Sequence, residues 1–401
     1  MKKRNDWISQ IAFYCFYVGI VIEVLLVLID KSAYINPVEG QMFRLTFLLF
    51  MAKVCMSRYT GREYLVIFLF GMLGAVSYFV TGRNEVIRLV VMVIACKDID
   101  MEKCLRVVFY MTLSGCVILA FLSVTRVYGS VSLIQDYGRG GEEIRYTLGM
   151  GHPNALHCMV WALTVLCLYL YGERMRWYGY LLLIMINLVF FYLTDSKTGF
   201  LVTLVTVIYA ALLRYTKKEL LKNIYVISGY LATISSILLS VIIAANAYRI
   251  YDYVWNGDRS TLTLFFERLN QALNGRIRIL VETDGFKGAI SSWKLFSDTH
   301  SDYYFDMGWV RLFYWYGIIP GVVFIIALIV LMIWCFHKKD YMAGVMIFSF
   351  GIYHITEAHG ISVYLARNYL FFLMGYCWYQ LPFLNGEREW YFWRWKKDAI
   401  L

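Results

Sequence analysis

The sequence predicts an all-α polytopic membrane protein, and three observations predict it. Hydrophobic residues make up 60% of the 401 residues and charged residues only 16%, a composition far from that of soluble domains. Apolar stretches of about 17 to 25 residues, the length that crosses a hydrocarbon core, recur along the whole chain. Lysine and arginine gather in short loops that would share one side of a membrane. We therefore expect about twelve membrane-spanning helices in a single integral membrane domain, residues 1–401.

The expected spans follow one another with mostly short polar connections. They cover residues 7–29, 40–57, 64–80, 85–96, 105–126, 148–171, 178–193, 199–213, 223–246, 308–336, 341–355 and 361–382. The stretch 85–96 is short for a crossing. No small-residue cleavage site follows the first span, so we expect that span to be retained as a helix.

The basic residues predict the orientation of the chain. If Lys2 and Lys3 stay in the cytoplasm, this number of crossings places both termini and every short basic loop inside. The net charge of +10 is then mainly a topology signal, and nucleic acid is not an expected partner. The nine cysteines fall outside the predicted outer loops and form no CxxC or Cys/His metal spacing. We expect no disulfide, no metal and no cofactor.

A large outer loop, residues 247–307, is expected between the ninth and tenth spans, and loops of that length usually carry function. Arginine outnumbers lysine on the predicted outer side, and its planar fork matches phosphate and carboxylate oxygens. Ordinary surface ion pairs are the alternative explanation. Four of these arginines lie inside apolar runs, where a charge needs a function or a buried partner: Arg44, Arg88, Arg311 and Arg367.

The outer loop contains an expected amphipathic helix within residues 260–280. Leu262, Phe265, Phe266 and Leu269 recur at three and four residues. Ser260 is suited to the N-cap, and Asn274-Gly275 to the helix end. Such a helix either lies among lipid headgroups, where it would hold Arg276 and Arg278 at the depth of phosphates, or packs on the helical bundle.

The end of the loop, "SDTHSDYYFDMGWVRLFYWYGIIPG", gathers acids and a histidine before a membrane helix. His300, Asp302 or Asp306 could remove a proton from a sugar hydroxyl. Loop caps and a metal site are the alternatives, although the spacing typical of metal ligands is missing. Tyr303 and the aromatic residues after it could stack on sugar rings or form an interfacial belt.

The stretch "RYTLGMGHPNALH", residues 145–157, leads a polar loop into an apolar helix. Its glycines permit close backbone approach, Pro153 suits a helix start, and Arg145 would reach the headgroup zone. Backbone donors at such a start face an anion. We expect His152 and Asn154 to fix this turn, and His157 to be a satisfied core histidine.

Four stretches together resemble the bacterial oligosaccharide repeat-unit polymerase and O-antigen ligase superfamily, whose Wzy-type members lengthen surface polysaccharides. They are "RYTLGMGHPNALH", "LNGRIRI", "HSDYYFDMGWVRLFYWYGIIPG" and "ITEAHGISVYLARNYLFFLMG", in family order. The third departs from the family pattern, because Ser301 stands where an asparagine is expected.

The resemblance implies a polymerase of polyprenyl-diphosphate-linked repeat units for capsule, exopolysaccharide or O-antigen, in a bacterial cell membrane. It implies metal-independent inverting transfer at the outer face, with His300 as the base and Asp302 and Asp306 as competitors. The diphosphate would bind Arg145 and Arg276. Arg278 and Arg311 are further candidates for diphosphate binding. The candidates for substrate binding are His152, Asn154, Tyr303 and Glu357. Membrane lipid, flippase and chain-length regulator proteins are the further expected partners.

Two alternatives remain open at this point. A polysaccharide ligase of the same superfamily shares these motifs. A flippase or transporter of lipid-linked sugars would have a similar number of spans, but carriers tend to show paired halves and charges near the bilayer midplane.

Overall fold

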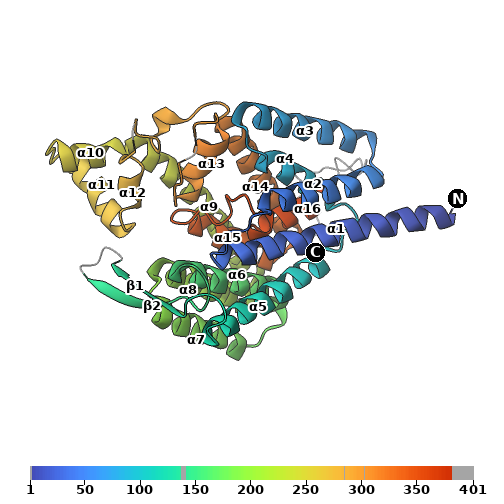
Figure 1. Ribbon diagram of the computed structural model, residues 1–401, viewed down its shortest axis with the longest axis horizontal. Coiled ribbons are helices and arrows are strands. Elements are labelled where there is room, and N and C mark those ends of the chain that lie inside the picture. The colour runs from blue at the N-terminus through green and yellow to red at the C-terminus, as the bar shows by residue number, and fades with distance from the viewer. Residues whose placement is uncertain (1, 137–140, 284, 302, 382–401) are drawn as a thin grey trace, which may run out of the picture.

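The computed structural model describes residues 2–136, 141–283, 285–301 and 303–381 and is mostly helical (Figure 1). The longer helices are α1 (Lys2–Lys31), α2 (Glu39–Met56), α3 (Gly61–Thr81), α5 (Met101–Val124), α6 (Pro153–Tyr171), α7 (Trp177–Thr194), α8 (Lys197–Tyr215), α9 (Glu219–Asn246) and α14 (Ile318–Lys338). The shorter helices are α4 (Glu85–Ala95), α10 (Tyr248–Trp255), α11 (Thr261–Ala272), α12 (Arg276–Ile279), α13 (Gly308–Tyr316), α15 (Tyr341–Tyr353) and α16 (Leu370–Tyr379). Single turns of 3-10 helix are η1 (Gly172–Arg174), η2 (Ile290–Ser292) and η3 (Leu365–Arg367).

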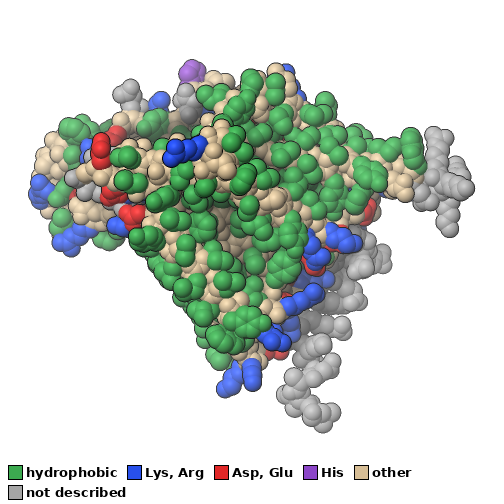
Figure 2. All heavy atoms as spheres, turned by 60° about the horizontal axis from the view of Figure 1, so that its bottom comes forward, with side chains coloured by type: hydrophobic (Ala, Val, Ile, Leu, Met, Phe, Trp, Pro, Cys, Tyr) green, Lys and Arg blue, Asp and Glu red, His purple; other side chains and the backbone are tan. Residues whose placement is uncertain are grey.

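Eight helices of the described chain are long and apolar enough to cross a membrane. They are Trp7–Lys31, Gly61–Thr81, Met101–Val124, Pro153–Arg174, Trp177–Thr194, Lys197–Tyr215, Glu219–Asn246 and Ile318–Lys338. Figure 2 shows a face covered mainly by hydrophobic side chains, with charged side chains gathered toward its ends. These helices are those of a multi-pass membrane protein. The count of about twelve crossings stays a prediction, because α4, α15 and α16 are shorter than a bilayer requires.

Gly317 breaks the predicted span 308–336 into α13 and α14. Its φ of 99° lies in the region that favours glycine, and a Cβ there would come within 2.6 Å of the Leu295 carbonyl oxygen. The preceding loop accepts hydrogen bonds from the first N–H groups of α14, which have no acceptor within the helix. The N–H groups of Ile318 and Ile319 donate to the Lys294 and Leu295 carbonyls at 2.9 and 3.0 Å. The break therefore joins the end of the large loop to the bundle.

The predicted span 361–382 is also not continuous helix. Residues 354–369 run mainly as turns with η3, and α16 begins only at Leu370. A buried ion pair holds this segment: Arg88 and Glu23 lie 2.8 Å apart, with side-chain exposures of 3% and 0%. Arg88 also donates to the Val363 carbonyl at 3.0 Å, and the Leu365 N–H donates to Glu23 at 3.3 Å. The buried partner expected for Arg88 is thus Glu23.

The ends of the helices form two groups. At one end, which we call the site end, Gly151 N–H donates to the Lys31 carbonyl and Gly308 N–H to the His354 carbonyl, both at 2.9 Å. At the opposite end, Lys97 pairs with Glu63 at 2.6 Å. Loops that lie at the same end of the structure were also predicted to lie on the same side of the membrane. Which of the two ends faces the cytoplasm stays a prediction.

The segment 247–307 lies at the site end, and its helices α10, α11 and α12 form the left extremity of Figure 1. The amphipathic helix predicted here is confirmed as α11. Ser260 is its N-cap and accepts from the Thr263 N–H at 3.4 Å, while Gly275 follows the helix with a φ of 78°. Phe266 is buried against the protein and Phe265 is exposed, so the apolar stripe is only partly covered.

The all-α class describes most of the chain, but two strands that were not predicted from the sequence, β1 (Ser132–Asp136) and β2 (Glu142–Tyr146), pair antiparallel. Ile134 lies opposite Ile144, and both side chains are exposed. Cross-strand apolar pairs of this kind stabilise a hairpin. The hairpin carries Arg145 toward the bundle on its other face, because neighbouring residues of a strand point to opposite sides.

Candidate functional site

Side chains from five segments gather at the site end, and we call this group the polar centre. Its members are Lys31 at the end of α1, His152 before α6, Arg276 at the start of α12, Asp306 before α13 and Glu357 after α15. Two glycines permit the close packing of their segments. A Cβ on Gly151 would lie 2.5 Å from the Cβ of Ala33, and one on Gly308 would lie 2.7 Å from Cδ2 of His354.

Arg276 and Glu357 form the core of the polar centre. The Arg276 guanidinium lies 2.8 Å from the Glu357 carboxylate and donates through Nε to the Thr356 carbonyl at 2.6 Å. It also donates to the Leu273 carbonyl at 3.3 Å, which closes α12 onto the end of α11. Arginine carries five N–H donors, so these contacts leave donor capacity for a ligand. The structure thus brings together two residues that the sequence assigned to diphosphate and substrate.

The surroundings of Glu357 oppose its negative charge. Burial raises its pKa to about 6; the charge of Asp306 acts in the same direction, while Arg276 and Lys31 act against it. A quarter of the side-chain surface remains exposed, at 25%, but dense protein around the carboxyl still removes water from it. Carboxyl groups with raised pKa values are frequent at functional sites.

His152 caps α6, as expected from the sequence. Its Nδ1 accepts a hydrogen bond from the Asn154 N–H at 3.1 Å, and Pro153 occupies the first helical turn. Burial lowers the pKa of His152, Arg145 and Lys31 lower it further, and Asp306 raises it. The cap therefore keeps a neutral imidazole beside the charges of the polar centre. Asn154 serves this turn through its backbone.

Arg145 reaches the same region from β2. It is buried and pairs with Glu143 on its own strand and with Asp195, 3.5 Å away, before α8. Its charge acts on His152. The hairpin thus adds a second guanidinium beside the polar centre.

The three candidate bases differ in their exposure and in their position relative to the polar centre. Asp306 is half-buried between Phe305 and Met307, and its charge acts on both His152 and Glu357. His300 is exposed, and its backbone N–H donates to Asp298 at 3.1 Å. Asp302 lies outside the described residues. The described structure therefore brings Asp306 to the polar centre, and it does not bring His300 there.

Two further predicted residues lie at the surface. Arg278 is nearly half exposed and pairs with Glu282 one turn later. Tyr303 is partly exposed, its ring contacts Phe305 at a centroid distance of 5.0 Å, and its carbonyl accepts from the Trp315 indole at 2.8 Å. Neither side chain takes part in the Arg276–Glu357 arrangement.

Arg311 is buried at a different place. Its guanidinium stacks on the rings of Tyr304 and Trp315, at 3.8 and 3.4 Å from their centroids. Arg83, which the sequence analysis did not select as a site residue, lies 4.4 Å from the centroid of the same Trp315 ring and donates to the Ser301 carbonyl. The predicted arginine set is therefore divided between the polar centre and this second location.

Other residues at the site end were not selected from the sequence as site residues. Arg367 and Asp30 lie 3.5 Å apart, and Cys158 Sγ lies 2.9 Å from Nδ1 of the buried His359. For Arg367 the sequence did hold a signal, namely a charge inside an apolar run. His157, by contrast, is the satisfied core histidine expected, since its ring nitrogens lie 3.0 Å from Thr194 and from Asn187.

Within the described ranges, no group of three or more His, Cys, Asp or Glu side chains is arranged to hold a metal ion. The polar centre can bind an anion through its guanidinium groups and can accept a proton at Asp306. No family model, curated protein or solved structure matches the chain.

Proposed function

We propose that the protein polymerises oligosaccharide repeat units carried on a polyprenyl diphosphate, at the outer face of a bacterial cell membrane. The observation that supports this most is the polar centre, where Arg276, Glu357 and Asp306 meet beside the ends of membrane-length helices. Such a position suits a substrate with a lipid anchor and a polar glycan. The resemblance of the four sequence stretches adds the reaction type.

In this reaction the hydroxyl oxygen of the acceptor sugar attacks the anomeric carbon of the donor glycan. The bond from that carbon to the diphosphate oxygen breaks, and the polyprenyl diphosphate leaves with the bonding electrons. The hydroxyl proton passes to a carboxylate on the opposite face of the ring, as inversion by a single displacement requires. We assign this role to Asp306, because it is the described candidate base that faces the polar centre.

Arg276 and Arg145 would stabilise the charge that develops on the leaving diphosphate. Their carboxylate partners hold the guanidinium groups in place before substrate arrives, and fixed donors of this kind stabilise a developing charge without reorganisation. Loss of one such donor typically costs about 100-fold to 1000-fold in rate. His152 would position the start of α6, where its Nδ1 accepts from the Asn154 N–H.

Deletion of the gene in its host tests the proposal. Glycans are extracted with their polyprenyl carrier and identified by mass spectrometry, and the outer-face pool is separated by its accessibility to an added enzyme. Single repeat units stranded on the outer face support a polymerase. Long chains retained on the carrier would assign a ligase, and units trapped on the inner face would assign a flippase.

Complementation with variants connects that phenotype to the polar centre. Glu357→Gln and Arg276→Ala should leave single units on the carrier. The matched controls are Glu282→Gln and Arg259→Ala, which remove a carboxylate and a guanidinium from exposed positions in the same segment. Restoration of full polymer by the polar-centre variants would contradict the assignment of this site.

A further inference from the structure

Two guanidinium groups share one indole ring at the second location described above. The Arg83 group lies 4.4 Å and the Arg311 group 3.4 Å from the centroid of the Trp315 ring. Arg311 also lies 3.8 Å from the centroid of the Tyr304 ring. Aromatic rings attract a cation but carry no net charge, so this packing leaves both positive charges uncompensated.

Neither Arg83 nor Arg311 forms an ion pair with a carboxylate in the part of the chain that the structure describes. Arg311 is only 4% exposed, and its Nε has no hydrogen-bond partner among the described residues. The buried Nε of Arg83 likewise has no partner within the described ranges. A buried guanidinium without a carboxylate is costly unless an anion binds there, so the two arginines form a candidate anion site.

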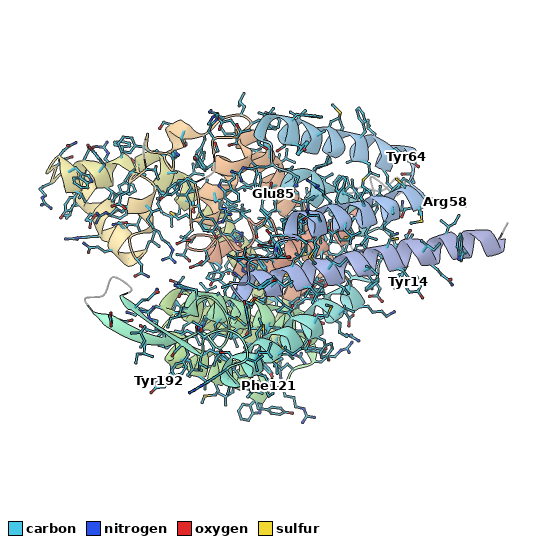
Figure 3. All side chains as sticks on the ribbon, in the orientation of Figure 1. Tyr14, Arg58, Tyr64, Glu85, Phe121 and Tyr192 are labelled. Carbon is cyan, nitrogen blue, oxygen red and sulfur yellow. The ribbon has the colours of Figure 1, made fainter. Side chains whose placement is uncertain are left out.

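The surrounding charges indicate how much negative charge this site accepts. Glu85 lies in the same neighbourhood, since its charge acts on the Tyr316 hydroxyl together with those of the two arginines, and Figure 3 shows it in the interior of the molecule. Arg88 and Arg367, whose charges also reach the site, are already paired with carboxylates. Glu85 therefore offsets one of the two guanidinium groups, and a single carboxylate on a ligand balances the other. A diphosphate would bring more negative charge than this site balances.

The Tyr304 ring provides a surface for a sugar. More than half of this side chain is exposed, at 54%, although Arg311 packs against it. The Trp315 indole holds the loop in place by donating to the Tyr303 carbonyl at 2.8 Å. A sugar ring has an apolar C–H face that packs on an aromatic ring, and a planar carboxylate matches the fork of N–H groups on a guanidinium. A sugar that carries a carboxylate fits both features, whereas a phosphate fits only the second.

The same loop connects Tyr304 to the proposed base Asp306, two residues later. The Cα atoms of residues two apart lie at most about 7 Å from each other. In an extended chain such residues also point to the same side, and the rings of Tyr303 and Phe305, which contact each other at 5.0 Å, agree with this pattern. A sugar stacked on Tyr304 therefore lies beside the group proposed to remove the proton from the acceptor hydroxyl.

We infer that Arg83 and Arg311 bind the carboxylate of a hexuronic acid whose ring stacks on Tyr304. The carboxylate and the sugar ring follow from the two guanidinium groups and the exposed aromatic ring. The position of this sugar in the acceptor glycan rests on the proposed function, through Asp306. The assignment separates Arg311 from the arginines proposed to bind the diphosphate, and it predicts that the repeat unit contains an acidic sugar.

Binding of disaccharides tests the site without any transfer reaction. Purified full-length protein in phosphatidylcholine nanodiscs is titrated with cellobiouronic acid, with cellobiose and with inorganic pyrophosphate, and calorimetry measures the dissociation constants. Cellobiose differs from cellobiouronic acid only in carrying a hydroxymethyl group in place of the carboxylate. Cellobiouronic acid should bind about 10-fold to 100-fold more tightly than cellobiose, the range of a hydrogen bond to a charged group.

Arg311→Gln should remove this difference, and Arg83→Gln gives the same test at the less buried arginine. The matched control is Arg259→Gln, because Arg259 also stacks on a tyrosine ring, at 4.2 Å, but lies exposed. Equal binding of the two disaccharides to the wild-type protein would overturn the carboxylate site. Pyrophosphate that binds more tightly than cellobiouronic acid, and loses this binding in Arg311→Gln, would assign the site to a phosphate ligand instead.

Transfer kinetics distinguish a contact with substrate from a structural role of Arg311. Single lipid-linked units are isolated from the deletion strain, and in one portion the carboxyl groups of the uronic acid are reduced to hydroxymethyl groups. The wild-type protein should use the reduced unit with a kcat/KM lower by about 10-fold to 100-fold, mainly through a higher KM. Arg311→Gln should show that lower value with both units. If reduction of the unit lowers kcat/KM of Arg311→Gln as much as that of the wild-type protein, Arg311 acts only through the fold.

Tyr304→Ala tests the stacking of the sugar ring. This variant should raise the KM for both units, because the ring packs on the sugar whether or not the carboxylate is present. The matched control is Tyr248→Ala, which removes another exposed ring with an arginine packed against it, at 4.9 Å. An unchanged KM in Tyr304→Ala would overturn the stacking.

The same measurements distinguish this inference from the proposed function. If the wild-type protein prefers cellobiouronic acid through Arg311 while the gene deletion leaves the surface glycans normal, the site stands and the polymerase proposal fails. If the deletion strands single units that contain no acidic sugar, the polymerase proposal stands and the carboxylate site fails.

Discussion

Arg276 and Glu357 lie 81 positions apart in the chain, yet their charged groups approach to 2.8 Å. The pair joins the segment before α13 to the turn segment after α15, and Arg276 strengthens the connection through the Thr356 carbonyl. The distance between these two charged groups is therefore a measure of whether the polar centre is assembled.

The raised pKa of Glu357 predicts a pH-dependent stability. The group titrates at about 6 in the folded protein and near its ordinary value of 4.5 when unfolded, so the folded state binds more protons between these values. The contribution of Glu357 is fully present below pH 4.5 and is lost as the pH rises to about 6. Thermal unfolding in detergent should therefore show wild type losing stability relative to Glu357→Gln across that range. A constant difference between the two proteins would refute the shift.

Asp306→Asn should lower polymer formation by about 100-fold or more, the typical contribution of a positioned base. The amide keeps the size of the side chain and cannot take the proton. His300→Ala, at the exposed position, is the decisive comparison, and polymer length is read on gels of extracted glycan. If His300→Ala stops polymerisation and Asp306→Asn does not, the base is His300.

Breaking the Glu23–Arg88 pair should destabilise the protein strongly. Removing one partner leaves a buried charge and typically costs about 3 to 5 kcal/mol. Glu23→Gln combined with Arg88→Met should cost less than Arg88→Met alone, since the uncompensated carboxylate is then gone. A double-mutant cycle on unfolding in detergent measures this coupling, and strictly additive effects would show that the pair contributes nothing.

His152→Ala should cost about 1 kcal/mol through the loss of an N-cap. Asparagine is a good N-cap residue, so His152→Asn should restore that stability. Measuring polymer formation in the same two variants distinguishes the stabilising effect of the N-cap from a direct contact between the imidazole and the substrate. If His152→Asn is stable and inactive, the imidazole itself acts on substrate.

Gly308→Ala should loosen the polar centre. The added Cβ would come within 2.7 Å of His354 and 3.0 Å of the Glu357 carbonyl, so the turn after α15 must move away. Gly71→Ala is the matched control, because nothing lies within 4 Å of a Cβ there. Cross-linking of cysteines introduced at 276 and 357 should fall in Gly308→Ala and stay unchanged in Gly71→Ala.

Local signals in the sequence predicted several elements well. Ser260 and Gly275 marked the two ends of α11, and the pattern His-Pro-Asn marked the start of α6, because capping and turn chemistry act over a few residues. The antiparallel pair of β1 and β2 was missed, since its cross-strand pair of Ile134 and Ile144 is formed only when the two strands meet.

The broken helices and the divided arginines depend on contacts distant in sequence. Gly317 breaks a continuous apolar run because residues 294–297 occupy the space and satisfy the new helix start. In the sequence nothing distinguishes Arg83 from the other arginines of the predicted outer side. Only the fold places Arg83 beside Trp315 together with Arg311. Neither position could be recognised from periodicity or spacing.

The Glu23–Arg88 pair also constrains the order in which the chain can be assembled. Glu23 is synthesised 65 residues before Arg88, and α1 alone would carry its carboxylate into hydrocarbon, which costs a few kcal/mol. α1 therefore gains its stable position only when α4 arrives with the guanidinium. A helix that is synthesised earlier therefore completes its insertion only after a later one.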